Sequence, residues 1–143
     1  MPRPYETLPP LINRVMEKVV AVGNKDYQAF GLNVRGARVM LALADGEALR
    51  VFEIIARCGI EPSTFSHLLT RLAKLGYVTR QRPEEDNRAV LVRLTARGRQ
   101  VARQCRVLVD RHHHLIADRL SAGEVESLRK LMLKLYKGLG QPE

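Results

Sequence analysis

The chain has little that would suit an oxidising compartment or a membrane. Its 143 residues contain only two cysteines, Cys58 and Cys105. Two cysteines cannot form the disulfide framework of a small secreted domain, so we expect a reducing compartment. No apolar run is long enough to span a bilayer, and the opening residues MPRPYETLPP lack the pattern of a signal peptide. The sequence therefore predicts a cytoplasmic location and no membrane partner.

The common catalytic motifs are also missing. There is no G-x-S-x-G, no glycine-rich phosphate loop, no H-E-x-x-H and no pair of carboxylates in an evident cleft setting. We find no internal repeat and no low-complexity segment. These absences predict a protein that is not an enzyme, with no catalytic residues and no cofactor.

Acidic residues are the minority among the charged ones. The chain has 24 Lys and Arg against 15 Asp and Glu, a formal net charge of +9. Residues 76–106 alone contain eight arginines and three acids, so this segment contributes +5 of the +9. Such clustering indicates a polyanionic partner, either nucleic acid or an anionic membrane surface. A generically basic protein is the alternative.

Apolar spacing predicts a mainly helical chain with one hairpin. Hydrophobic residues make up 45% and charged residues 27% of the sequence, which is typical of a globular domain. After an extended, proline-rich arm, we expect helices at about 11–30, 33–44, 47–58 and 63–75, followed by a hairpin at 76–98. A long helix should begin after Thr95, and the capping box Ser121–Glu124 should open the last helix.

Two of these helices are joined by the short turn Cys58-Gly59-Ile60-Glu61-Pro62, which is the arrangement of a helix-turn-helix. The hairpin GYVTRQRPEEDNRAVLVRLTARG follows directly and extends this to a winged helix. A helix fits the major groove of DNA, and its polar side chains can reach base edges. Arginines on the hairpin can hold phosphates beside it.

The stretch GIEPSTFSHLLTRLAKLGYVTRQRPEEDNRAVLVRLTARG resembles the signature region of the MarR (multiple antibiotic resistance regulator) family of transcription factors. Asp86-x-Arg88 followed by Leu94-Thr95-x-x-Gly98 is similar to that family's wing motif. The resemblance covers roughly residues 11–139, because GLNVRGARVMLALA resembles the family's second helix and the capping-box helix resembles its C-terminal dimer helix.

The resemblance implies a winged helix-turn-helix fold, mainly α with a small β-hairpin wing and with N- and C-terminal dimerisation helices. One domain would occupy 1–143, with dimerisation helices at about 11–30 and 99–143 and a DNA-binding lobe at about 31–98. It also implies a homodimer on palindromic double-stranded DNA, where the protein would lie with the nucleoid. The dimer would act as a repressor that a small, often aromatic, acid releases.

The predicted DNA contacts lie on the fourth helix and the hairpin. Polar residues opposite an apolar stripe usually form a solvated face, but these follow a helix-turn-helix turn inside the matched stretch. Arg80 and Arg82 are expected to contact phosphates, and Arg88 the minor groove. The expected helix contacts are Ser63, Thr64, Ser66, His67, Thr70, Arg71 and Lys74.

The acidic tip of this basic hairpin has an explanation in the family pattern. There the wing aspartate, Asp86, would orient Arg88 by accepting hydrogen bonds from an arginine or from hairpin amides. Glu84 and Glu85 are interpreted as solvated turn residues. Asn87 stands where a second arginine is common in the family, which weakens the expected minor-groove contact.

Several other residues have open interpretations. Arg35 and Arg38 would hold an effector carboxylate or a DNA phosphate, or are ordinary surface arginines. His113 would line an effector pocket or the dimer interface, or is simply solvated. Three consecutive histidines, 112–114, point about 100° apart on a helix, so we predict no metal site there.

Two alternatives to a ligand-controlled regulator remain. Cys58 and Cys105 are predicted to be small core hydrophobes, with thiol redox sensing by the same kind of regulator as the alternative. A winged helix that serves as a protein-interaction module is the other, because a fold does not determine a function.

Overall fold

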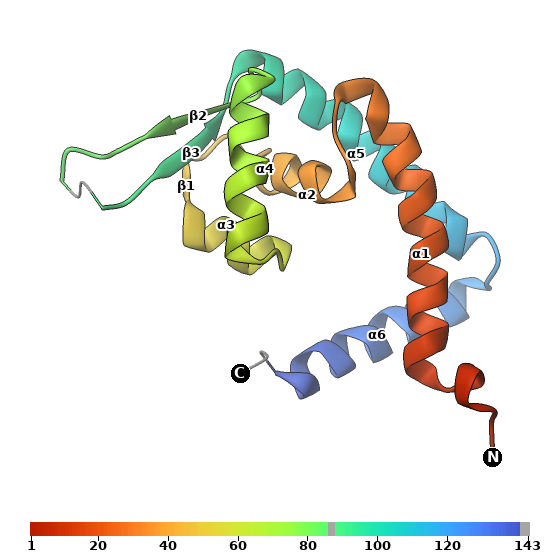
Figure 1. Cartoon of the computed structure of the whole chain (residues 1–143). Coiled ribbons are helices and arrows are strands. Elements are labelled where there is room, and N and C mark those ends of the chain that lie inside the picture. The colour runs from red at the N-terminus through yellow and green to blue at the C-terminus, as the bar shows by residue number, and fades with distance from the viewer. Residues whose placement is uncertain (86–87, 141–143) are drawn as a thin grey trace. The chain divides into compact units, whose positions relative to one another are not determined.

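A computed structural model describes residues 1–85 and 88–140 (Figure 1). The chain divides into two compact units, residues 1–109 and residues 110–143. Its elements, where η marks a short 3₁₀ helix, are η1 (Pro4–Glu6), α1 (Leu8–Tyr27), η2 (Gln28–Phe30), α2 (Val34–Ala42), β1 (Leu49–Arg50), α3 (Val51–Cys58), α4 (Pro62–Lys74), β2 (Val78–Gln81), β3 (Leu91–Leu94), α5 (Ala96–Ala117) and α6 (Ala122–Leu139).

The first unit has a single core. Helices α2, α3 and α4 lie together beside the sheet, and the β2–β3 hairpin extends away from them (Figure 1). The end of α1 and the start of α5 complete the core with Tyr27 and Cys105. Its largest fully buried side chains are Tyr27, Phe65, Met40, Leu43, Ile54, Leu72, Val39, Val92 and Cys105. The predicted mainly α fold with a hairpin wing is confirmed.

The hairpin forms two strands of a three-stranded antiparallel sheet with the order β1-β3-β2. Val78 pairs with Leu94 and Gln81 with Leu91. In β3, Val92 and Leu94 are buried while the intervening Arg93 is exposed. This alternation is the period-2 pattern of a strand with one face on the core, as predicted.

We expected the proline-rich start to be an extended arm, and this prediction is wrong. Pro4 opens η1, and α1 begins at Leu8 rather than near residue 11. Pro9 and Pro10 therefore lie in the first helical turn. Proline is tolerated there because the first backbone N–H groups of a helix have no intrahelical acceptor. At the other end, α1 stops at Tyr27, and residues 28–30 tighten into η2 before Gly31.

The third helix is shorter than predicted. We expected it to start at Glu47, but residues 49–50 form β1, and α3 starts at Val51. Leu49 pairs with Val92 of the hairpin. This pairing is not visible in the local sequence, because the partner strand lies about forty residues further along the chain and a two-residue strand shows no periodicity.

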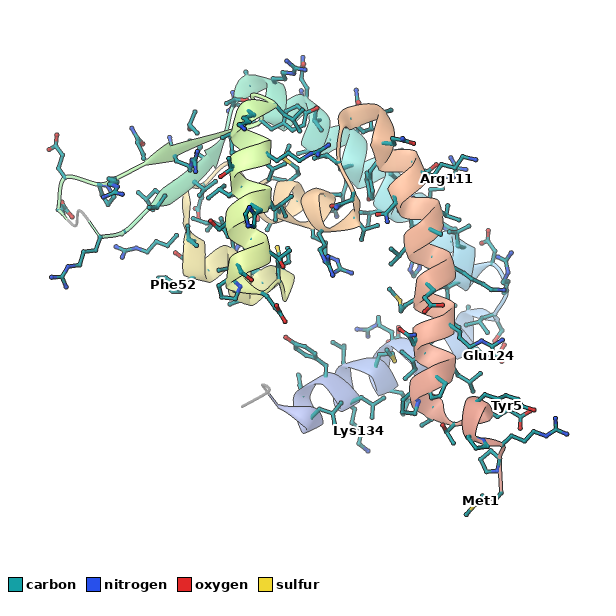
Figure 2. The ribbon with its side chains drawn as sticks, in the orientation of Figure 1. Met1, Tyr5, Phe52, Arg111, Glu124 and Lys134 are labelled. Atoms are coloured by element: carbon teal, nitrogen blue, oxygen red, sulfur yellow. The ribbon has the colours of Figure 1, made fainter. Side chains whose placement is uncertain are left out.

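The second unit consists of the end of α5, where Figure 2 labels Arg111, and helix α6, where it labels Glu124 and Lys134. The predicted capping box is present: the Ser121 hydroxyl accepts from the Glu124 N–H at 3.2 Å, and the Glu124 carboxylate accepts from the Ser121 N–H at 2.9 Å. Over the described residues, none of the helices combines the length and apolar character needed to cross a membrane.

Candidate nucleic-acid interface

Helix α4 has one buried and one exposed face. Phe65, Leu69 and Leu72 recur at helical spacing and lie in the core. Pro62 occupies the first helical turn, as the sequence predicts. The turn before it is formed by Gly59, whose φ of 63° is left-handed and suits glycine. The helix-turn-helix geometry is thus set by local residue choices.

The opposite face of α4 has the predicted polar residues. Ser63, Ser66, His67 and Lys74 are exposed along this face. Thr64 and Thr70 are half-buried, and the Thr70 hydroxyl donates to the Ser66 carbonyl at 3.1 Å. Small hydroxyl and imidazole groups near a helix N-terminus suit contacts with phosphates and base edges.

Arg71 makes a contact that the sequence did not indicate. Its Nε and Nη2 atoms both donate to the backbone carbonyl of Gly31, at 3.2 Å and 3.0 Å. The guanidinium that we expected to read bases is therefore held against the junction between η2 and α2. Nothing in the sequence pairs residues 31 and 71, which are forty positions apart.

The root of the wing is tied to the end of α4 by the Leu94-Thr95-x-x-Gly98 segment. The Thr95 N–H donates to the Tyr77 carbonyl at 2.9 Å, and the Thr95 hydroxyl donates to the Gly76 carbonyl. The same hydroxyl accepts from the Gly98 N–H at 2.9 Å and caps α5 as predicted. One threonine thus connects α4, the wing and α5.

The wing arms are basic and exposed. Arg80 lies in β2 and Arg82 just beyond it, and together with Gln81 and Val90 they line a shallow hollow. Arg88 is exposed on the other arm, and Glu84 and Glu85 are exposed turn residues, as we interpreted them. Asp86, the proposed orienting carboxylate, lies outside the described residues, as does Asn87.

The segment that forms this interface is similar to known transcriptional regulators. A family model described as the MarR family matches residues 30–89, the segment from η2 to the wing. The transcriptional regulator SarZ of Staphylococcus epidermidis is 33% identical over 88 residues, which are 61% of this chain and 60% of SarZ. This segment of the chain matches the MarR family. Its relatives are named transcriptional regulators, which confirms the predicted class of protein rather than an enzyme.

Solved MarR-family structures extend the match beyond the winged helix. Escherichia coli MarR, as a cysteine-to-serine mutant complexed with operator DNA, is 25% identical and covers 94% of this chain and 99% of its own, with a TM-score of 0.81. CouR from Rhodococcus jostii, bound to p-coumaroyl-CoA, is 28% identical and covers 87% and 88%, with a TM-score of 0.75. The similarity to these MarR-family proteins therefore includes the flanking helices.

The three predicted effector residues are exposed. Arg35 and Arg38 lie on α2 in the first unit, and His113 lies on α5 in the second. Its neighbour His114 donates from Nδ1 to the Asp118 carboxylate at 2.9 Å, and this hydrogen bond raises the pKa of His114. Within residues 1–85 and 88–140, no group of three or more His, Cys, Asp or Glu side chains is placed to hold a metal ion.

Both cysteines are buried free thiols, as the core interpretation predicts. Burial raises the pKa of Cys105 to about 11. Burial also raises the pKa of Cys58, although the guanidinium groups of Arg38 and Arg57 act in the opposite direction. A thiol with a raised pKa is a poor nucleophile at neutral pH, so neither environment favours redox sensing.

Proposed function

We propose that this protein is a homodimeric repressor that binds a palindromic operator in double-stranded DNA through α4 and the wing. The observation that carries the proposal is the position of the polar face of α4 and the basic β2–β3 arms on one compact unit, tied together through Thr95. The similarity to MarR in complex with operator DNA supports it. A regulator of this kind would work in the cytoplasm, on the nucleoid.

The two parts of the interface would have different roles. Ser63, Thr64 and His67 lie in the first turns of α4 and would contact base edges or phosphates in the major groove. Arg80 and Arg82 would hold phosphates, and Arg88 would reach the minor groove. Phosphate contacts set affinity for any DNA, whereas base contacts set sequence preference.

Dimerisation would use the apolar side chains that one protomer leaves uncovered. Exposed apolar surface of this extent is unusual on a monomer and marks an interface. On α1 these side chains are Leu8, Leu11, Ile12, Val15 and Met16, on α5 Val107 and Val109, and on α6 Leu128, Leu131, Met132, Leu133, Leu135, Tyr136 and Leu139. Two copies would present two α4 helices to two half-sites about one helical turn apart.

A small acid, with an aromatic group, is the proposed effector. Arg35 and Arg38 are one helical turn apart on α2 and offer guanidinium groups to a carboxylate. His113 is the third proposed contact. The similarity to CouR, which is bound to p-coumaroyl-CoA, supports a ligand with an aromatic acyl group.

Selection of genomic fragments on the purified protein, followed by sequencing at two salt concentrations, tests the proposal. Recovery of a palindrome is the expected result, and its affinity should fall linearly in log[salt] by about 0.9 per phosphate contacted. Sequence-blind binding, or a negligible salt slope, would contradict operator reading and favour a protein-interaction module. Fragments that are released by aromatic acids, but not by their amides, would support the effector.

A further inference from the structure

The C-terminal end of α4 is hydrogen-bonded to a two-residue segment, Phe30–Gly31. Arg71 donates twice to the Gly31 carbonyl. The Tyr77 hydroxyl, just after α4, donates to the adjacent Phe30 carbonyl at 2.6 Å. Leu75 packs on the same segment, because a Cβ at position 31 would lie 3.3 Å from its Cδ2 atom.

These carbonyls are a natural attachment point. They lie at the last residue and the C-cap of η2, where backbone C=O groups have no partner further along the helix. Gly31 has a φ of 72°, so the chain reverses there and its carbonyl points out of the helical ladder. A guanidinium can place two N–H donors on one such oxygen, which an ammonium cannot do with the same geometry.

The same segment is held by α1. Helix α1 runs directly into η2, and the Leu32 N–H donates to the carbonyl of Tyr27 at 3.2 Å. The side chain of Asn24, also on α1, accepts from the Val34 N–H at 2.9 Å and so caps α2. The junction therefore has hydrogen bonds to α1 on one side and to α4 on the other.

We infer that Arg71 is a positioning residue that fixes α4 relative to α1, and so sets the distance between half-sites that the dimer accepts. The inference rests on the proposed function, because α1 must lie in the dimer interface for its orientation to control where the two α4 helices lie. In this role Arg71 reads no base, in contrast to our expectation from the sequence. Its Nε and Nη2 atoms both donate to Gly31, so these hydrogen bonds are not available for contacts with bases.

Binding to operators with altered spacing separates positioning from base reading. The half-sites are kept constant, and the spacer between them is lengthened or shortened by single base pairs. In Arg71→Ala, the ratio of affinities for the preferred and altered spacers should fall by on the order of tenfold, which is the effect of losing a charged hydrogen bond. The base preference inside each half-site should not change. Tyr77→Phe, which removes only the hydroxyl, should act in the same direction, and Arg71→Lys should restore part of the discrimination.

Lys74→Ala is the matched control, because it removes a positive charge one turn along the same exposed face. It should weaken binding to all spacers equally. A changed base preference in Arg71→Ala, or spacer discrimination equal to wild type, would overturn the inference while leaving operator binding intact. Failure of the wild type to recover any palindrome would instead overturn the proposed function, and the spacing role with it.

A second measurement needs no DNA. A chain that carries spin labels at both Lys25→Cys on α1 and Ser66→Cys on α4 reports the distance between the two helices. Dilution into unlabelled protein prevents distances between two labelled chains from contributing. The native cysteines are buried and should not take the label. Arg71→Ala should broaden the distance distribution, and Lys74→Ala should not. An unchanged distribution in Arg71→Ala would refute the positioning role.

Discussion

The first turn of α5 passes so close to Tyr77 that Gly98 has no space for a side chain. A Cβ at position 98 would overlap the carbonyl carbon and oxygen of Tyr77, and these are backbone atoms that cannot rotate away. The Tyr77 carbonyl also accepts the Thr95 N–H at 2.9 Å. The glycine of the wing motif is therefore required by the close approach of two backbones, at a residue with no unusual φ.

Gly98→Ala should lower the free energy of unfolding by roughly 2 kcal/mol, because the helix must shift away from Tyr77. Gly123→Ala is the matched control, since it also lies in the first turn of a helix and meets nothing closer than 4.0 Å. That change should be neutral or stabilising by up to about 1 kcal/mol. Urea denaturation of both variants measures the difference, and equal stabilities would contradict the packing argument.

Thr95→Val should cost about 1–2 kcal/mol, because it removes the helix cap and the bond to Gly76 while it keeps the shape of the side chain. Thr95→Ser retains the hydroxyl and should lose much less. Since Thr95 also joins the wing to α4, amide hydrogen exchange in β2 should accelerate in Thr95→Val. Unchanged exchange would show that the hydroxyl caps α5 without holding the wing.

Arg80→Ala should weaken binding to cognate and random DNA alike, with a salt slope reduced by about 0.9, as for a phosphate contact. Arg88→Ala should likewise weaken binding at every site. Lys130→Ala on α6 is the charge-matched control and should leave both the affinity and the slope near the wild-type values. Titrations at several salt concentrations measure these slopes.

His67→Ala should change which bases are preferred, by about 1–3 kcal/mol at the position it reads. Ser66 lies beside it on the same exposed face, so Ser66→Ala tests whether any change on this face has the same effect. Affinities for operators substituted at each position give the comparison. Equal losses on cognate and random DNA would make His67 a phosphate contact.

The thiols should react slowly in the folded protein. The pKa of Cys105 is raised to about 11 by burial, so its thiolate is scarce at neutral pH. The protonated thiol is favoured by folding, and this contribution to stability is present below the unfolded pKa of about 9 and is lost as the pH rises towards 11. Alkylation in buffer and in urea measures the protection; rapid alkylation or peroxide-sensitive DNA binding in buffer would revive the redox alternative.

His114 should titrate above its ordinary pKa of 6.5, because the Asp118 carboxylate stabilises the imidazolium. The pair contributes to stability fully below pH 6.5, and the contribution is lost as the pH rises through the raised pKa of the folded state. Asp118→Asn should return the pKa towards 6.5. A titration of the imidazole followed by NMR checks both variants.

Much of this architecture follows from the sequence by itself. Helix spacing, the capping box at Ser121 and the cap at Thr95 are determined by residues within one or two turns of each other, so local patterns predict them. The polar face of α4 follows from the apolar stripe opposite, since burying Phe65, Leu69 and Leu72 leaves the other side to solvent. The arginines of the hairpin predict the basic wing, and the resemblance of residues 59–98 to the MarR signature region predicts the class of protein.

Only the tertiary structure decided which distant groups meet. β1 exists because Leu49 lies against Val92, and a two-residue strand has no signal of its own. The local sequence does not distinguish Arg71 from the other cations of α4, whereas the fold brings the Gly31 carbonyl within hydrogen-bond distance of its guanidinium. Hydrogen bonds between residues forty positions apart depend on the packing of whole helices, and packing is a property of the assembled core rather than of any segment of the chain.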